Sequence, residues 1–200
     1  MVRKIILASA SPRRKELLEK IGLKFEVEPG DCKEIVDIDL EAHELVRRLS
    51  REKAEVVARK HRNAVIIAAD TVVLIDDKIL GKPHNRTEAK KVLRTLSGKS
   101  HVVITGFTII DTAKRRILSR EVETKVYIRE LNSEEIDAYV NSGEPLDKAG
   151  AYAIQGLGSV LVEKIEGDYF NVVGLPLSAL SESLKEFGID VWENNLRECR

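Results

Sequence analysis

Residues 4–14 read KIILASASPRR, and this stretch predicts how the chain begins to fold. Lys4–Ala8 is a short run rich in β-branched residues, the pattern of a buried strand. Ser11 stands where a helix N-cap is expected, Pro12 fits the first helical position, and Gly22 marks the end of that helix. A strand that leads directly into a helix is the repeating step of an α/β fold.

The same alternation continues along the chain. An acidic, irregular stretch over 31–40 interrupts it. The other expected elements are an edge strand at Lys24–Glu28, a helix over about 41–61, a strand at Ala64–Ala69 that ends at Asp70, a hairpin of Val72–Ile75 and Lys78–Leu80, a helix capped by Thr87 that runs to about Leu96, long antiparallel strands at Val102–Asp111 and Ile117–Tyr127, a helix at Ser133–Asn141, a strand at Val160–Ile165, and a last helix from Pro176 to Gly188. This order predicts an α/β protein with a mixed sheet. We expect a single domain of two lobes over 1–188, with a cleft between the lobes, and a tail over 189–200.

Composition excludes several classes of protein. Lysine and arginine together number 33, as do aspartate and glutamate, so the chain has no excess of basic charge for non-specific nucleic-acid binding. The longest apolar run, Ala64–Ala69, is too short to cross a membrane. Cys32 and Cys199 are far apart and form no CxxC pattern, which fits a reducing compartment. We therefore expect a cytoplasmic protein that binds neither nucleic acid nor membrane.

The turn after the first strand predicts a phosphate site. Arg13 and Arg14 lie in the first turn of the expected helix, where cations oppose the helix dipole and therefore need another reason to be present. Free N–H groups at the helix start and two arginines beside Ser9 suit a phosphate. The alternative is a capped surface helix whose arginines are solvated.

Two further segments carry candidate charges. Asp70 and Thr71 follow a buried strand, and a carboxylate at the end of a strand in an α/β sheet suits a metal ligand or a general base. A turn-forming aspartate is the alternative. Lys82 stands between Gly81 and Pro83, from where it could reach a phosphate. Read alone, the tripeptide favours an exposed turn lysine over a phosphate contact.

The segment 143–158 is rich in glycine and contains the chain's single glutamine, Gln155. Glycines permit close backbone approach, and the glutamine amide can pair with a nucleobase. The alternative is a tight loop whose glycines serve only backbone geometry. The histidines at 43, 61, 84 and 101 show no ligand spacing, and His101 at a strand start is interpreted as structural. Chemistry therefore falls to carboxylates, which favours a metal-dependent reaction.

Several motifs occur together and in order, and they identify a resemblance. They are LASASPRR at 7–14, Lys53-Ala54, ADTVV at 69–73, GKP at 81–83, LSG at 96–98 and EPLDKAGAY at 144–152. Over roughly residues 3–188 the chain strongly resembles the Maf family of nucleoside triphosphate pyrophosphatases. The resemblance implies an elongated mixed sheet flanked by helices, as in the inosine-triphosphatase superfamily. It also implies hydrolysis of a nucleoside triphosphate to monophosphate and pyrophosphate with a divalent cation (Mg²⁺, Mn²⁺ or Co²⁺).

The resemblance also implies roles for individual residues. Asp70 matches the catalytic acidic residue, and Glu34 matches the other carboxylate at the metal, although the acidic run of the family is reduced here to DCKE at 31–34. The positions that contact phosphate are Ser9, Arg13, Arg14, Lys53 and Lys82. The positions that set base preference in the subgroup acting on dTTP and UTP are Arg13, Thr71 and Gln155.

Other functions stay open at this point. One is the sister subgroup that resembles 7-methyl-GTP pyrophosphatases. Another is a nucleotide-binding regulator of septum formation with little turnover, since members of the family are associated with arrest of septum formation in bacteria. An intact Asp70 and Lys82 favour an enzyme, because a binding module has less need of a general base. The frequent dimers of the family suggest a homodimer.

Overall fold

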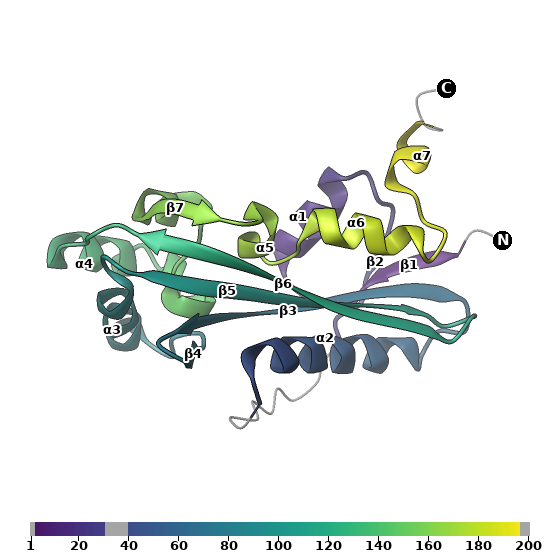
Figure 1. Cartoon of the computed structure of the whole chain (residues 1–200), viewed down its shortest axis with the longest axis horizontal. Coiled ribbons are helices and arrows are strands. Elements are labelled where there is room, and N and C mark those ends of the chain that lie inside the picture. The colour runs from purple at the N-terminus through teal and green to yellow at the C-terminus, as the bar shows by residue number, and fades with distance from the viewer. Residues whose placement is uncertain (1–2, 31–39, 197–200) are drawn as a thin grey trace. The chain divides into compact units, whose positions relative to one another are not determined.

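The computed structural model describes residues 3–30 and 40–196 of the chain (Figure 1). The strands are β1 (Lys4–Leu7), β2 (Glu26–Val27), β3 (Ala64–Ile75), β4 (Lys78–Leu80), β5 (Ser100–Asp111), β6 (Arg116–Ile128) and β7 (Val162–Glu166). The α-helices are α1 (Pro12–Lys20), α2 (Ala42–Ala58), α3 (Arg86–Leu96), α4 (Ser133–Asn141), α5 (Tyr169–Val173), α6 (Leu177–Lys185) and α7 (Val191–Leu196). Short 3-10 helices η1 (Glu144–Asp147), η2 (Ala149–Ala151) and η3 (Gly156–Leu161) lie between α4 and β7.

These strands form a seven-stranded sheet. Its order is β2-β1-β3-β5-β6-β7, and β4 pairs with β3 outside this path. Strand β1 pairs in parallel with both β2 and β3, whereas β4 runs antiparallel to β3 and β7 runs antiparallel to β6. The expected α/β class, a mixed sheet with flanking helices, is confirmed. In the part of the chain that the structure describes, no helix is long and apolar enough to span a bilayer.

The chain divides into two compact units. The first comprises Met1–Asp70, Thr105–Val122 and Gly174–Arg200, and the second comprises Thr71–Ile104 and Glu123–Val173. The long strands β3, β5 and β6 each contribute residues to both units. The assignment of a single domain over 1–188 and the cleft between lobes stay predictions.

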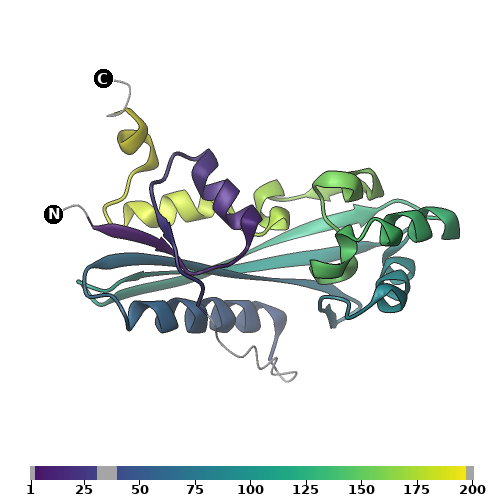
Figure 2. The same cartoon turned by 180° about the vertical axis from the view of Figure 1, so that it is seen from behind.

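In the first unit, α2 lies along one face of the strands and α1 and α6 lie along the other (Figures 1 and 2). Side chains of a strand alternate between its faces, so one alternate set from β1 and β3 packs against α2. That set contains Ile6, Ala64, Ile66 and Ala68, which cluster with Ala54 and Val57 of α2 and with Ala8, the residue after β1. Gly106 of β5 lets the helix approach closely, because a Cβ there would lie 2.4 Å from the carbonyl oxygen of Val46.

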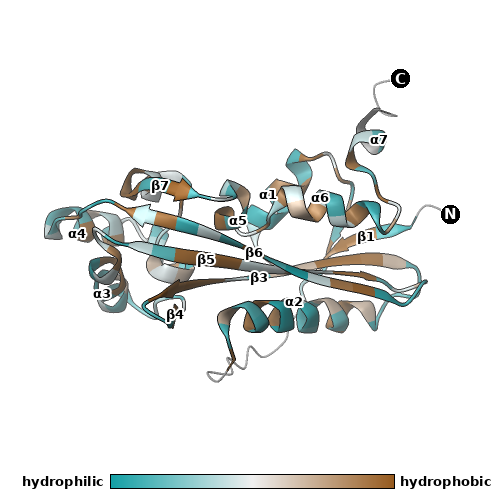
Figure 3. Ribbon diagram, in the orientation of Figure 1, coloured by the Kyte–Doolittle hydropathy of each residue, from teal (hydrophilic) through white to brown (hydrophobic). Residues whose placement is uncertain are grey.

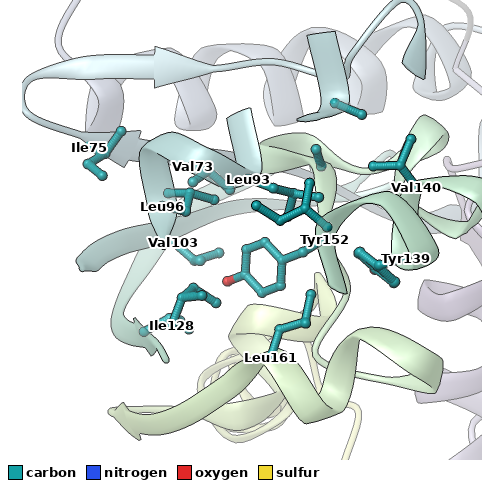
Figure 4. Packing of buried hydrophobic residues seen from close by; sticks show 14 residues of the cluster. Val73, Ile75, Leu93, Leu96, Val103, Ile128, Tyr139, Val140, Tyr152 and Leu161 are labelled. Carbon is teal, nitrogen blue, oxygen red and sulfur yellow. The ribbon is translucent and has the colours of Figure 1, made fainter. Parts of the chain in front are cut away.

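The second unit has its own hydrophobic core (Figure 4). Leu93 and Leu96 of α3, Val140 of α4 and Tyr152 after η2 pack there beside Val73 of β3. Strand β3 is hydrophobic over most of its length (Figure 3), as expected for a strand buried on both faces. This core supports the 3-10 helices that follow α4.

The expectation that the strand from Ala64 ends at Asp70 is wrong. Strand β3 runs without a break from Ala64 to Ile75 and includes both Asp70 and Thr71. The polar pair resembles a strand end in the sequence, but the Asp70 carboxylate can remain inside the strand because a lysine from α2 neutralises its charge. Asp70 therefore does not lie beyond the carboxyl end of a strand.

Helix ends also differ from expectation in two places. Asn85, and not Thr87, caps α3: its side chain accepts a hydrogen bond from the Glu88 N–H at 2.9 Å, while Thr87 already lies inside the first turn. The helix after Pro176 is also not the last one. Helix α7 follows it, within the stretch that was expected to be only a tail.

Candidate active site

Lys53 and Asp70 form an ion pair in the first unit. Asp70 shares the strand face of Ala68, which packs against α2, and Lys53 is the helix residue next to Ala54 in that contact. The Lys53 Nζ donates to Asp70 Oδ1 at 2.5 Å. The side chain of Lys53 is 14% exposed and that of Asp70 is 13% exposed. The attraction between the two charges offsets the loss of hydration that burial causes.

The chain segment before residue 31 also packs against Lys53. A Cβ on Gly30 would lie 2.3 Å from the Lys53 carbonyl oxygen, so only glycine fits this position without a shift of the backbone. Glu34, the second carboxylate expected at the metal, lies outside the described residues.

The turn between β1 and α1 is held by Ser9 and Arg14. Ser9 Oγ accepts from the Ser11 N–H at 3.2 Å and from Arg14 Nη1 at 3.3 Å. Arg14 Nε donates to the Gly174 carbonyl oxygen at 2.8 Å. Ser11 occupies the N-cap position, but its side chain makes no capping hydrogen bond. Both Ser9 and Arg14 therefore have a structural task in this turn.

Arg13 differs from Arg14. It is half-buried and makes no hydrogen bond or ion pair with any residue that the structure describes. The turn leaves β1 beside β3, because Leu7 pairs with Ile67 in parallel register and the Ala8 N–H donates to the Ile67 carbonyl at 2.7 Å. Strand β3 reaches Asp70 three residues later. In the first unit the arginine turn, which follows the end of β1, thus lies alongside the middle of β3, where the Lys53–Asp70 pair is found.

The other candidate residues belong to the second unit. Thr71 is half-buried and directly follows Asp70 in β3. Lys82 is exposed on the turn after β4, and the Gly150 N–H donates to the Gly81 carbonyl at 3.2 Å. The turn of Lys82 is therefore tied to the segment 144–152. Whether the residues of the two units act in one site stays a prediction.

Gln155 lies between η2 and η3, in a loop fixed by two residues that the sequence reasoning did not single out. Its own side chain is half-buried and makes no hydrogen bond to another described residue. The Glu144 carboxylate accepts from the Leu157 N–H at 3.0 Å and the Gly158 N–H at 2.9 Å. The Tyr139 hydroxyl accepts from the Ala153 N–H at 3.1 Å. Glu144 is the first residue of the motif EPLDKAGAY and could have been identified from it, whereas Tyr139 lies in none of the motifs.

His101 is part of the core, as its interpretation as structural requires. It is 2% exposed, and its Nε2 lies 2.7 Å from the Tyr152 hydroxyl oxygen. Burial lowers the pKa of the imidazole from 6.5 to about 4. His101 is consequently neutral at physiological pH, and its hydrogen bond with Tyr152 lies within the second unit.

The described residues contain no group of three or more His, Cys, Asp or Glu side chains that could hold a metal ion. They still fit a cation that arrives with a polyphosphate. Mg²⁺ in such sites takes one or two carboxylates and completes its shell with phosphate oxygens and water. Asp70 supplies one carboxylate, of which Oδ1 accepts from Lys53, and no other described residue bonds to Oδ2. This donor set suits a cation shared with substrate.

A family profile described as Maf-like protein matches residues 4–187 of the chain. The chain belongs to the Maf family. A Maf relative from Methanococcoides burtonii, a dTTP/UTP pyrophosphatase, is 53% identical over 96% of this chain and 100% of its own length. The dTTP/UTP pyrophosphatase of Caldicellulosiruptor saccharolyticus is 47% identical over 98% of this chain and 100% of its own. The dTTP/UTP pyrophosphatase of Bacillus anthracis is 50% identical over 95% of this chain and 98% of its own length.

Proposed function

We propose that the chain hydrolyses dTTP and UTP to the nucleoside monophosphate and pyrophosphate, with a divalent cation. The observation that carries this proposal is the Lys53–Asp70 pair, in the part of β3 that lies beside the turn of Arg13. It combines a mostly buried carboxylate with cationic groups of the kind that bind a polyphosphate. The names of the Maf relatives support the choice of nucleotide.

In this proposal the residues of the chain bind, orient and accept a proton. The phosphates are contacted by Ser9, Arg13, Arg14, Lys53 and Lys82, and Ser9 and Arg14 also hold the turn that presents Arg13. Water attacks the α-phosphorus, the bond from that phosphorus to the bridging oxygen breaks, and pyrophosphate leaves with the electron pair. Asp70 takes the proton from the water. Phosphoryl transfer requires mainly such positioning and charge stabilisation.

Asp70 and Glu34 are the carboxylates that would hold the cation. When bound, the cation polarises the phosphoryl oxygen and lowers the pKa of water. Lys53 donates to Oδ1 of Asp70, and no other described residue bonds to Oδ2, which supports this role.

The base is assigned to Gln155, helped by Thr71 and Arg13. Uracil and thymine present a carbonyl acceptor beside an N–H donor, and an amide offers the matching donor and acceptor. Guanine presents two adjacent donors, which would favour a carboxylate at this position. A flipped amide also pairs with cytosine, so the other two residues or the shape of the pocket must exclude it. The amide of Gln155 is half-buried and makes no hydrogen bond to any other described residue, which supports this assignment.

The proposal extends to the setting of the enzyme. We place it in the cytoplasm as a homodimer that binds no nucleic acid. Equal numbers of acidic and basic residues support the last point.

The test is pyrophosphate release from a panel of dTTP, UTP, CTP, GTP and 7-methyl-GTP, with added Mn²⁺ and after removal of metal by a chelator. We expect turnover of dTTP and UTP that the chelator abolishes and Mn²⁺ restores. Faster turnover of 7-methyl-GTP would assign the chain to the sister subgroup. Tight nucleotide binding without turnover would instead assign it to the regulators of septum formation.

A further inference from the structure

We propose that Tyr139 and Glu144 are positioning residues for Gln155, and that this pair determines the selectivity among bases by fixing the backbone on both sides of the glutamine. The inference rests on the proposed role of Gln155 in reading the base. It concerns residues of the second unit only. It adds two residues to the site that have no assigned contact with phosphate or metal.

The hydrogen bonds of the pair enclose the position of Gln155. The Tyr139 hydroxyl donates to Glu144 Oε1 at 2.8 Å and accepts from the N–H of Ala153, two residues before the glutamine. Glu144 Oε1 and Oε2 accept from the N–H groups of Gly158 and Leu157, on the other side of it. One tyrosine–glutamate pair therefore holds both ends of the loop 153–158.

The glycines of the loop are required by the same pair. Gly156 has φ +68°, and a Cβ there would lie 2.5 Å from Glu144 Oε2. A Cβ on Gly158 would lie 2.3 Å from the Ala153 carbonyl oxygen and 2.5 Å from the Tyr139 hydroxyl oxygen. The loop backbone is thus in direct contact with the pair. In this proposal the glycines serve the backbone geometry that positions Gln155.

The pair itself is anchored in the core. Tyr139 is 6% exposed and packs in the hydrophobic cluster of the second unit together with Val140 and Leu161 (Figure 4). Glu144 begins η1 and follows Gly143, whose φ of +83° turns the chain out of α4. The buried ring therefore transmits the rigidity of the core to the loop. Gln155 is fixed through its backbone while its amide stays available.

The charge of Glu144 favours the same arrangement. Burial raises the pKa of its carboxyl, but hydrogen bonds from Gly158, Tyr139 and Leu157 outweigh burial, so the pKa lies below its usual value. Burial and the contact with Glu144 raise the pKa of Tyr139, which therefore remains a phenol that donates to the carboxylate. Both oxygens of Glu144 already accept protein hydrogens. This use of the carboxylate argues for positioning and against proton transfer.

The proposal makes a specific claim about two conservative variants. Tyr139→Phe keeps the ring in the core and removes the hydroxyl bonds to Glu144 and Ala153. Glu144→Gln keeps the shape but replaces an acceptor by a donor that faces N–H groups. We expect each variant to lower the ratio of kcat/KM for UTP to that for CTP by about tenfold, mainly through KM for UTP, because a mispositioned amide loses its base contacts.

The matched control is Tyr152→Phe. This tyrosine lies in the same hydrophobic cluster, and its hydroxyl bonds to His101 and to none of the loop residues. We expect it to lower the unfolding temperature and to leave the UTP-to-CTP ratio unchanged. A loss of stability alone would therefore not reproduce the effect expected of Tyr139→Phe.

The decisive measurement combines Tyr139→Phe with Gln155→Ala. If the tyrosine acts through the glutamine, the double variant has the same selectivity ratio as Gln155→Ala alone. Multiplied losses in the double variant, or unchanged ratios in both single positioning variants, would overturn the proposal. If wild type instead prefers another nucleotide, the proposed function fails, and the same cycle on that nucleotide still tests the positioning.

Discussion

Lys53 of α2 donates to Asp70 of β3 at 2.5 Å, and both side chains are mostly removed from water. The two residues belong to different elements and are brought together because Asp70 lies on the strand face that α2 covers. A charged pair at this place serves the fold and, in the proposed function, also the reaction. The variants below separate the two contributions.

Asp70→Asn is expected to abolish turnover while nucleotide binding persists. Removal of a general base or metal ligand lowers the rate by about 10² to 10⁴ or more. Pyrophosphate release and calorimetric binding of dTTP measure the two effects. Asp77→Asn, in the exposed turn between β3 and β4, is the control and should retain full activity. A near-normal kcat for Asp70→Asn would remove this residue from the catalytic role.

Lys53→Met is expected to destabilise the fold by about 1–3 kcal/mol, because the Asp70 charge loses its ammonium partner. In the Asp70→Asn background, Lys53→Met should lower the free energy of unfolding by a clearly smaller amount. Urea unfolding of the two single variants and the double variant measures this coupling. Strictly additive costs would show that the pair does not stabilise the fold.

Arg13→Ala and Arg14→Ala are expected to have different effects although the residues are adjacent. Arg13→Ala should lower kcat/KM by roughly 10- to 150-fold, the effect of one charge-assisted contact, with little change in unfolding temperature. Arg14→Ala should lower the unfolding temperature, because it removes the bonds to Gly174 and Ser9. Lys82→Ala should behave like Arg13→Ala, since Lys82 is exposed. Kinetics and thermal unfolding of the three variants give the comparison, and a large loss of stability in Arg13→Ala with unchanged kinetics would make Arg13 structural.

Gln155→Glu is expected to lower kcat/KM for dTTP and UTP by about tenfold or more. A carboxylate facing the base carbonyl leaves two acceptors without a donor, which costs about 1–3 kcal/mol. The nucleotide panel measures this change together with any gain for guanine nucleotides. An unchanged base preference would show that Gln155 does not read the base.

His101 is expected to make the fold sensitive to mild acid. The folded imidazole has a pKa near 4 and the unfolded one a pKa near 6.5, so the unfolded chain binds the proton more readily. The stabilisation is complete above the higher value and is lost as pH falls towards the lower one. Between pH 7 and pH 5 this group should lower the free energy of unfolding by about 2 kcal/mol. Urea unfolding at both pH values measures the loss, and His101→Gln should show a smaller one.

Much of the fold could be predicted from the sequence. Hydrophobic periodicity and helix signals identified most elements, including Ser133–Asn141 with the observed bounds. The strand end at Asp70 was mispredicted because its neutralising partner, Lys53, lies 17 residues earlier on another element. Periodicity describes one segment at a time and carries no information on such a pair.

The roles of the site residues stay predictions, but the structure shows which of their contacts the sequence could not reveal. Motifs identified the residues around the arginine turn, but they could not distinguish Arg13 from Arg14, because the carbonyl that holds Arg14 belongs to Gly174, 160 residues away. The pair of Tyr139 and Glu144, here called the clamp because it holds the loop 153–158, was also missed. Its bonds go to backbone N–H groups, which no side-chain pattern reveals.

The contact of Gly156 and Gly158 with the tyrosine–glutamate pair restricts how this enzyme can be redesigned for other nucleotides. Any side chain at either glycine would collide with the clamp, so randomising these positions would mostly produce misfolded loops. Leu157 between them contributes its N–H to the clamp, yet its side chain is 61% exposed. A library that varies residues 155 and 157 together, with both glycines kept, would explore base preference without damaging the loop.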